Sequence, residues 1–579
     1  MKLNPIIQNV TDKIQKRSEV SRESYINRMN AARKDGPKRA HLTCGNQAHA
    51  YAPVVEDQER LIEGIGGNIG IINAYNDMLS AHQPFQKYPD IIKKVARLSG
   101  GTAQVAAGVP SMCDGITQGQ TGMELSLFSR DAIAMSAAIG LSHNVFDTTI
   151  YLGVCDKIVP GMVISAATFG HLPAIFLPAG PMPTGQSNDE KAKIRQDFAE
   201  GKADRSDLMA SEMASYHGPG TCTFYGTANT NQMLMEFMGL HLPGSSFVNP
   251  DTPLRNALTE FGTSHALSIS DLSSNYIPVF NILDEKAYVN GIIGLMATGG
   301  STNLLIHLIA MARASGVLLD WSDFAEISKV IPLLARVYPN GLADVNHFHA
   351  AGGLGLVISE LLSANLLHND TQTIMGKGLE KYTKDPKLID GKLDWYSGVT
   401  NSLNSKIISN ISKPFQNSGG LADLNGNLGS AVMKISAVAE ERRKITAPVR
   451  VFNNQKSVID AFRNGEFTND VIIAVRYQGP RANGMPELHN LTPSLSVLQN
   501  RGLKVALITD GRMSGASGKV PAAIHMSPEA LDGGPISYLK DGDIITVDAV
   551  EGIISVDNEK IFDRKVTHPD LSDNDFGVG

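Results

Sequence analysis

The 579-residue chain has few of the features that mark membrane, secreted or nucleic-acid-binding proteins. No apolar run approaches the roughly 20 residues that a membrane-spanning helix needs. The 51 basic and 58 acidic residues give a net charge of −7 without any basic block, which argues against nucleic acid as a partner. The N-terminus lacks the uninterrupted apolar segment of a signal peptide, and its acidic residues are atypical of transit peptides. We therefore expect a cytoplasmic protein with no membrane partner.

Cysteine is also scarce, with four residues in the whole chain. In a cytoplasmic protein we expect reduced thiols or metal ligands rather than disulfides. Three of the four, Cys113, Cys155 and Cys222, lie in turns that are rich in glycine or flanked by carboxylates. A lone cysteine is more often a small buried hydrophobe, but the Asp that follows two of them is an unusual neighbour for an inert thiol. No CxxC pair, HExxH motif or ferredoxin-type run is present, so metal ligands would come from separate loops.

The acidic residues beside these thiols are Asp114 and Asp156. Thiolates are soft ligands suited to iron–sulfur clusters, whereas carboxylates are hard ligands suited to Mg²⁺. Glu487, in the segment 484–487, is a further candidate ligand for a hard metal and is otherwise an ordinary surface acid. Soft and hard ligands side by side predict a site that uses both kinds of metal.

The patterning predicts an α/β fold in the first two thirds of a chain that is too long for one core. An amphipathic helix is expected at residues 10–34. Apolar runs at residues 69–74, 149–154 and 174–177 end in polar or Gly/Pro turns, with Ala-rich helical stretches between them. This alternation predicts a large N-terminal α/β domain with a mostly parallel sheet. Chemistry in such folds collects at the carboxyl ends of strands, which is where Cys155 stands.

A change of character near residue 400 predicts a second, smaller domain. Residues 185–218 are polar and are interpreted as a helical excursion on the surface, and the polar residues 382–400 are the candidate linker. We expect domains at residues 1–395 and 396–579, the second of them β-barrel-like with few helices. Its expected strands are residues 447–452, 471–475, 505–509, 543–547 and 552–556.

Two further loops are rich in small and polar residues. Residues 298–303 precede an apolar helix expected at residues 304–314, so Ser301 or Thr302 would cap that helix or help its N–H groups to hold an anion. Residues 509–519 follow an apolar strand and combine Asp, Arg, Lys and two Ser with small residues that allow close backbone approach to a ligand. A tight turn alone would not need that combination, so we interpret this loop as part of a site.

Taken together, these segments resemble the dihydroxyacid/phosphogluconate dehydratase family over nearly the whole chain. The segments that carry the resemblance are residues 113–119, 155–162, 180–182, 298–303, 484–487 and 510–515. Three others resemble the branch of the family that acts on 6-phosphogluconate, namely residues 75–84, 222–231 and 517–521. The dihydroxyacid enzymes typically carry a Cys-Gly-Gly phrase where this chain has Cys222-Thr223-Phe224.

The resemblance implies dehydration of 6-phospho-D-gluconate to 2-dehydro-3-deoxy-6-phospho-D-gluconate, a step of the Entner–Doudoroff pathway. It also implies Mg²⁺ and an iron–sulfur cluster, for which we favour the 4Fe–4S over the 2Fe–2S form. A dihydroxyacid or unphosphorylated sugar-acid dehydratase is the first alternative, since it would share the catalytic residues and differ at the far end of the substrate. A non-catalytic iron–sulfur sensor is the second, and the presence of Ser514, Lys157 and Glu487 argues against it.

The cluster ligands follow from the same resemblance. Cys155 and Cys222 match cluster ligands of the family directly. The third ligand does not carry over, because many dihydroxyacid enzymes have a cysteine near the position of Met78 in this chain. We favour Cys113 for this role, since the residue after it matches a Mg²⁺ ligand, and Cys44 is the rival.

The remaining roles are also implied by the resemblance. The Mg²⁺ ligands would be Asp114, Glu487 and Lys157, with Asp156 beside them. Lys157 can serve only as a carbamate, because an ammonium has no lone pair to donate. Ser514 matches the family's proton acceptor.

The far end of the substrate needs cations or backbone N–H groups, and Arg512, Ser517 and Lys519 are its predicted contacts. Ser301 and Thr302 are further candidates for substrate binding. The expected partner is therefore a small phosphorylated sugar acid. The resemblance also suggests a homodimer with the site near the subunit interface. Relatives usually continue through another short helix after the position where this chain ends, a departure expected to affect active-site closure or dimer contacts.

Overall fold

A four-stranded parallel sheet organises the N-terminal region of the computed structural model, which describes residues 2–515 and 517–571. The strand order is β2-β1-β3-β4, and every neighbouring pair is parallel. The strands are β1 (Asn68–Asn73), β2 (Thr102–Gly108), β3 (Thr148–Leu152) and β4 (Ala174–Phe176). β1 and β3 are buried at every position, which explains their continuous apolar sequences. The predicted α/β domain is thus confirmed.

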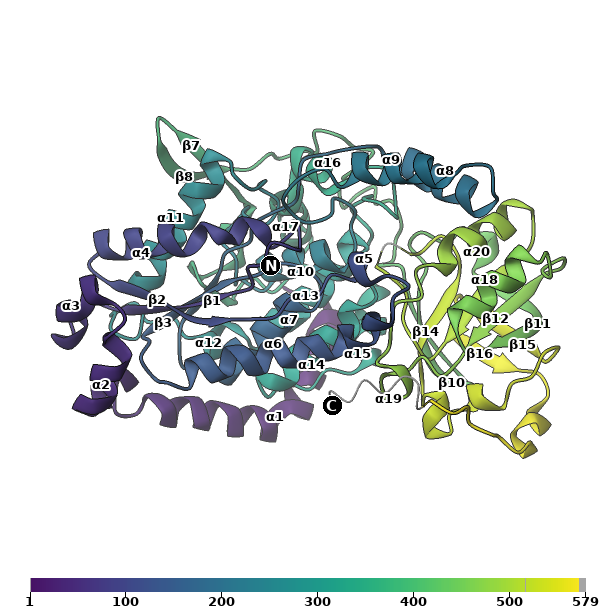
Figure 1. Ribbon diagram of the computed structural model, residues 1–579, viewed down its shortest axis with the longest axis horizontal. Helices are drawn as coiled ribbons and strands as arrows, with labels where there is room; N and C mark the ends of the chain where they lie inside the picture. Colours follow the sequence, from purple (N-terminus) through teal and green to yellow (C-terminus); the bar gives the residue numbers. More distant parts are fainter. Residues whose placement is uncertain (1, 516, 572–579) are drawn as a thin grey trace.

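Helices cover both faces of this sheet (Figure 1). α4 (Tyr88–Leu98) and α11 (Pro253–Ser268) pack together on one side, and α6 (Ser126–Leu141) and α7 (Ile158–Thr168) on the other. Four further helices are largely buried: α10 (Thr227–Phe237), α13 (Glu285–Thr298), α14 (Leu304–Ala314) and α17 (Gly353–Ser363). The amphipathic helix expected at residues 10–34 is α1 (Pro5–Arg33), which buries Ile7, Val10 and Ile14.

The polar excursion predicted at residues 185–218 contains α8 (Asn188–Ala199) and α9 (Arg205–Ser215). α8 begins with a capping box, in which the Ser187 hydroxyl accepts the N–H of Glu190 and the Glu190 carboxylate accepts the N–H of Ser187. α8 also packs against α20 (Leu491–Asn500) of the C-terminal region. The excursion therefore bridges the two regions, as Figure 1 shows at the top of the molecule.

The C-terminal region is a closed eight-stranded barrel, which confirms the predicted β-barrel-like domain. Its strand order is β10-β14-β13-β12-β11-β15-β16-β9. The bounds are β9 (Leu421–Gly426), β10 (Gly429–Lys434), β11 (Lys444–Phe452), β12 (Val471–Val475), β13 (Val505–Thr509), β14 (Ala522–Ser527), β15 (Ile544–Asp548) and β16 (Ile553–Val556). β11 to β14 are mutually parallel, and α18 (Gln455–Arg463) and α20 provide crossovers between them. Closure leaves no strand edge unpaired, and small and branched side chains fill the interior.

The stretch at residues 382–400, predicted to be a linker, is instead a β-hairpin. β7 (Lys384–Ile389) and β8 (Lys392–Ser397) pair antiparallel, and Trp395 anchors them by donating from Nε1 to the Pro243 carbonyl at 2.9 Å. Most side chains of β8 remain exposed, and this exposure is why the sequence looks like a linker. The division into domains at residues 395 and 396 stays a prediction.

No helix in the described part of the chain is both long enough and apolar enough to cross a bilayer.

Candidate active site

The carboxyl end of β3 delivers the central segment of the site. Cys155, Asp156 and Lys157 follow the strand and lead directly into α7. Cys155 has φ of 77°, a left-handed conformation that residues other than glycine seldom adopt and that concentrates at functional positions. Gly153 is required before it, because a Cβ there would lie 2.4 Å from Sδ of Met162. The tight turn from β3 to α7 thus places a thiol, a carboxylate and an amine within three consecutive residues.

A second segment approaches from the neighbouring strands. Asp114 opens the short helix α5 (Asp114–Thr117) after β2, and its carboxylate pairs with the buried Lys157 ammonium. Lys157 Nζ also lies 2.7 Å from Oδ2 of Asp156. β2 and β3 flank β1 in the parallel sheet, so their carboxyl ends lie at the same edge, and this shared edge brings the three residues together.

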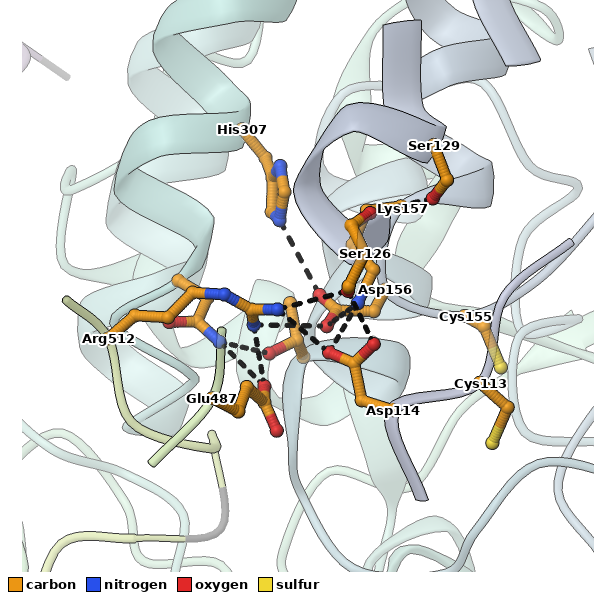
Figure 2. A network of polar contacts seen from close by, with 12 residues as sticks. Cys113, Asp114, Ser126, Ser129, Cys155, Asp156, Lys157, His307, Glu487 and Arg512 are labelled. Carbon is orange, nitrogen blue, oxygen red and sulfur yellow. Dashed lines mark hydrogen bonds and ion pairs between the residues drawn. The ribbon is translucent and has the colours of Figure 1, made fainter. Parts of the chain in front are cut away.

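The barrel contributes the opposite wall through Arg512, which follows β13 (Figure 2). Its Nη1 lies 2.7 Å from Oε1 of Glu487, and its Nη2 lies 3.0 Å from Oδ2 of Asp114. Its Nε donates to the Met485 carbonyl at 2.8 Å. Arg512 is therefore held within the carboxylate cluster by partners from both regions of the molecule.

Three carboxylates form a compact group with the donor set of a hard metal ion. Ligand atoms of Asp114, Asp156 and Glu487 all lie within 4.8 Å of one another. The cations Lys157 and Arg512 now compensate this negative charge. Carboxylate oxygens at this spacing fit Mg²⁺, which prefers such ligands together with water.

The electrostatics of this group are strongly perturbed. Burial alone would lower the pKa of Lys157, but Asp114 and Asp156 outweigh it and raise that pKa above its usual value. Burial would raise the pKa of Asp156, yet Lys157 leads the groups that hold it well below the usual range. Burial raises the pKa of Glu487 to about 8, although Arg512 acts in the opposite direction. Perturbations of this kind in a buried cluster are typical of functional sites.

Three residues that the sequence analysis did not single out complete the carboxylate group. Ser126, the first residue of α6, donates to Oδ1 of Asp114 at 2.5 Å, and Asn303 Nδ2 donates to Oε1 of Glu487 at 3.1 Å. His307 Nε2 lies 3.5 Å from Oδ1 of Asp156, and burial lowers its pKa to about 4, so the imidazole is neutral. On an apolar helix such as α14, His307 could not be distinguished by sequence from an ordinary core histidine.

The three predicted thiols gather beside this group. In Figure 2 the side chains of Cys113 and Cys155 point the same way, away from the carboxylates. Burial raises the pKa of Cys155 well above its usual value. The charges of Cys113 and Cys222 raise it further. Cys44 is exposed as the first residue of α2 (Cys44–Tyr51), at the far end of the N-terminal region (Figure 1).

A short turn before α10 positions Cys222. Asn229 Nδ2 donates to the carbonyls of Cys222 and Phe224 at 2.6 and 2.8 Å. Burial raises the pKa of Cys222 to about 12, and the Cys113 thiol adds to this effect. Three thiols from separate loops, which raise one another's pKa and are protonated in the absence of a metal, have the donor chemistry of an iron–sulfur cluster.

The glycine-rich loop after β13 reaches the same region. Ser514 is half-buried, and the next residue, Gly515, packs so closely that a Cβ would lie 2.5 Å from Oγ of Ser301. Ala516, within the predicted loop, lies outside the described residues. Ser517 lies 3.3 Å from Nδ1 of His489, a contact between side chains of the barrel region.

Two basic residues, Lys519 and Arg512, were also predicted to contact the substrate, and their surroundings differ. Lys519 is exposed, with Nζ 5.6 Å from the ring centroid of Tyr338. Arg512 is buried and donates to Glu487, Asp114, Ser126 and Met485. The two cations therefore do not form one phosphate-binding site in this structure.

The loop at residues 298–303 does not provide the side-chain cap that its sequence predicted. The N-cap residue of α14 is Asn303, and its side chain accepts no capping hydrogen bond. Ser301 is fully buried, lies 2.7 Å from Oγ1 of Thr227, and accepts the Asn303 N–H at 3.2 Å. Thr302 stands next to it with its side chain nearly buried. The hydroxyl pair ties the starts of α10 and α14 together beneath Gly515.

The sequence also matches the models of a known protein family and several of its named members. The family model described as "Dihydroxy-acid/6-phosphogluconate dehydratase N-terminal" matches residues 67–382, and the corresponding C-terminal model matches residues 406–574. Phosphogluconate dehydratase of Rhizobium meliloti is 57% identical, over 98% of this chain and 95% of that protein. The enzyme of the same name from Pseudomonas aeruginosa is 55% identical, over 100% of this chain and 95% of that protein.

A relative with a different name is more distant in sequence. Dihydroxy-acid dehydratase of Acetivibrio thermocellus is 35% identical, over 84% of this chain and 86% of that protein. Both family models and every relative named above point to the same catalytic family. The chain therefore belongs to the dihydroxy-acid/6-phosphogluconate dehydratase family and is a hydro-lyase.

Proposed function

We propose that this protein dehydrates 6-phospho-D-gluconate to 2-dehydro-3-deoxy-6-phospho-D-gluconate, as a step of the Entner–Doudoroff pathway. The observation that carries this proposal is the identity of 57%, 55% and 53% to three proteins named phosphogluconate dehydratase, over nearly their whole length. Identity falls to 35% for the protein named dihydroxy-acid dehydratase.

Mg²⁺ is proposed to bind at Asp114 and Glu487, with Asp156 beside them. The support is their spacing within 4.8 Å and the two cations that compensate their charge when no metal is bound. Lys157 would join them as a carbamate, which replaces a positive charge with a negative one at the centre of the group. Mass spectrometry of the intact protein with and without bicarbonate tests this step, and an unmodified Lys157 in the Mg²⁺-loaded protein would contradict it.

An iron–sulfur cluster, in the 4Fe–4S form, is proposed to bind at Cys113, Cys155 and Cys222. The mutual effects of these thiols on one another's pKa support the grouping. Cys155→Ser and Cys222→Ser should each lose iron, sulfide and activity together. Retention of iron and sulfide in either variant would reject the assignment.

The chemistry requires removal of the C2 proton and departure of the C3 hydroxide. When bound, the cluster and Mg²⁺ would supply Lewis-acid stabilisation of the leaving oxygen and of the developing negative charge. Ser514 is proposed to accept the C2 proton. A free serine is too weak a base for this, so the positive charge concentrated nearby must lower its pKa. Lys157 and Arg512 hold the carboxylates in place.

The chain's own polar groups would orient the substrate. Ser301 and Thr302 lie under the glycine-rich loop and are proposed to contact the sugar acid near its reacting carbons. Arg512, already bonded to the carboxylate group, is proposed to act at the substrate's carboxylate end. Ser517 and Lys519 are proposed to lie toward the opposite, phosphorylated end.

A homodimer is also proposed. The outer face of α6 and the adjacent edge strand β2 expose large apolar side chains, and a second copy of the chain would cover them. These side chains are Val105, Phe128, Met135 and Ile139. Analytical ultracentrifugation of the wild type and of Met135→Glu tests this. A wild type that sediments as a monomer would contradict the proposal.

The substrate proposal is tested by keto-acid formation from 6-phosphogluconate, gluconate and 2,3-dihydroxyisovalerate, with protein purified without oxygen. Clear preference for 6-phosphogluconate is expected. Preference for an unphosphorylated acid would keep the dehydratase chemistry and overturn the substrate. No turnover of any acid, with iron and sulfide present, would favour a sensor.

A further inference from the structure

Lys191, on α8, is a buried lysine that the proposed chemistry does not use. Its side chain is only 5% exposed. In the part of the chain that the structure describes, its ammonium forms no hydrogen bond and no ion pair. Its Nζ lies instead 5.2 Å from the ring centroid of Tyr216 and 5.7 Å from that of Phe224. Lysine is almost never buried to this degree without a partner, because an uncompensated charge is costly to remove from water.

The ammonium lies on the thiol side of the site. Burial and the Cys113 thiol raise the pKa of Cys222, and Lys191 leads the cations that oppose them. The leading influences on Glu487, apart from burial, come from Arg512 and the neighbouring carboxylates. Phe224, whose ring centroid lies 5.7 Å from Nζ of Lys191, is two residues from Cys222, so the ammonium lies near the Cys222 turn.

Hydrogen-bonding groups of the barrel lie at the N-terminal end of α20, the helix against which α8 packs. Ser517 Oγ lies 3.3 Å from Nδ1 of His489 and 3.2 Å from Oγ1 of Thr492, at the N-terminal end of α20. α8 packs against α20, and burial together with Arg195 and Lys191 lowers the pKa of His489. The positive end of the α20 dipole adds to the attraction for an anion.

Two acidic side chains, Glu212 and Asp344, act on the charge of Lys191, and both already have partners. Asp344 lies 2.9 Å from Nδ1 of His347 and accepts a hydrogen bond from the Thr184 hydroxyl at 2.7 Å. Glu212 accepts two hydrogen bonds from Arg195, from Nε at 2.6 Å and from Nη2 at 2.8 Å. This bidentate pair leaves Lys191 as the cation without a counter-charge between α8 and the thiols. Burial and Arg195 together lower the pKa of Lys191, as expected for an ammonium that lacks an anion.

We propose that Lys191 binds the phosphate of the substrate, with Ser517 and Thr492 as neighbouring hydrogen-bond donors. This inference rests on the proposed function. If the carboxylates hold the C1 end and the thiols surround the site of C3 chemistry, the phosphate lies three carbons beyond C3. It must then extend away from the carboxylates and past Cys222, toward Lys191. The rings of Tyr216 and Phe224 restrict the ammonium to one position, so it also selects for substrates that carry an anion there.

The test compares Lys191→Met, which keeps the length and the contact with the rings, with Lys191→Arg, which keeps the charge. Lys193→Met is the matched control, because Lys193 lies on the same helix but is exposed and pairs with Asp197. We expect Lys191→Met to lower kcat/KM for 6-phosphogluconate by about 30-fold, mainly through KM, as for the loss of one charged hydrogen bond. Turnover of gluconate should not change, Lys191→Arg should recover part of the loss, and Lys193→Met should behave as the wild type.

Iron and sulfide contents and the binding of inorganic phosphate, measured by calorimetry, separate the possible explanations. The inference predicts full iron and sulfide in Lys191→Met, with phosphate binding weakened by a similar factor. An unchanged KM for 6-phosphogluconate, equal losses on both substrates, or loss of iron would overturn it. If the wild type fails to turn over 6-phosphogluconate, the proposed function is wrong, and phosphate binding that is independent of Lys191 would reject the anion site as well.

Discussion

The carboxylate side and the thiol side of the site treat charge in opposite ways. On the carboxylate side, three acids, two partly buried and one buried, form ion pairs with the buried cations Lys157 and Arg512. On the thiol side, burial raises the pKa of all three thiols, and the nearby cation Lys191 has no ionic partner among the residues that the structure describes. One half is electrostatically complete without a ligand, and the other is not.

This difference shows how each half would respond to its metal. Thiols bind metals as thiolates, so loading of the thiol side must release protons. On the carboxylate side, a divalent cation would enter a group that already holds the positive charges of Lys157 and Arg512. One of these two charges must therefore be removed. Conversion of Lys157 to a carbamate would make that change, whereas Arg512 remains protonated in proteins. Ion pairs thus hold the carboxylate side in place before any metal binds. The thiol side is instead completed by the cluster that is proposed to bind there.

The largest expected effect is on turnover, from a residue that belongs to neither half. Ser514→Ala should lower kcat by about 100-fold or more, because the C2 proton would lose its acceptor. Iron, sulfide and Mg²⁺ contents should equal those of the wild type. Anaerobic kinetics with metal analysis checks this, and Ser457→Ala, at an exposed serine of α18, is the control. A kcat within a factor of a few of the wild type would remove Ser514 from the mechanism.

A smaller effect, on stability, would test whether the carboxylate side is preassembled. Arg512→Leu leaves buried carboxylates without a partner from the barrel, and breaking a buried pair from one side costs about 3–5 kcal/mol. Urea unfolding of the metal-free protein measures this loss. Arg501→Leu is the control, since Arg501 is exposed in its pairing with Glu200 and should cost no more than about 1 kcal/mol. Equal stability of the two variants would contradict a preassembled carboxylate side.

The smallest effect concerns Lys434 in β10, buried like Lys157 and Lys191, whose Nζ donates to the Gly299 carbonyl at 2.8 Å. Burial lowers its pKa from 10.5 to about 7. The unfolded chain therefore binds more protons between these values, so the stability of the wild type should rise with pH from about 7 to 10. Lys434→Met removes this dependence, and its advantage in Tm should shrink as the pH rises.

Thermal unfolding at several pH values measures the Lys434 effect. Lys504→Met, at an exposed lysine, should show no such trend. A difference between Lys434→Met and the wild type that stays constant from pH 7 to 10 would mean that Lys434 remains charged in the folded protein. A neutral Lys434 would differ from Lys191, whose ammonium is proposed to bind the phosphate of the substrate.

The sequence predicted the strands and the residues at their ends better than it predicted the contacts between regions. Continuous apolar runs located β1, β3 and the barrel strands because a buried strand tolerates few polar residues. The hairpin at β7 and β8 was misread as a linker, because exposed strands have the polar composition of a loop. Closure of the barrel could not be seen, since it depends on pairings between distant strands such as β9 and β16.

The same limit applies to the site. Local segments identified the thiols, the acids and Arg512, but the ion pair between Asp114 and Arg512 joins residues 398 positions apart. His307 and Ser126 contact the acids from helices whose sequences carry no polar signature of a site. Lys191 lies in a stretch with the composition of a solvated surface helix, but α8 packs on α20 and the rings of Tyr216 and Phe224 lie against the ammonium.

The central claim is that separate loops bring Cys113, Cys155 and Cys222 together as one cluster site beside the carboxylates. The most direct test is the iron and sulfide content of Cys113→Ser and Cys44→Ser, each purified without oxygen beside the wild type. The account predicts that Cys113→Ser loses both, because its thiol points the same way as that of Cys155 (Figure 2) and its charge acts on Cys222. Cys44→Ser should retain both, since Cys44 is exposed at the start of α2. Retention in Cys113→Ser with loss in Cys44→Ser would contradict the account.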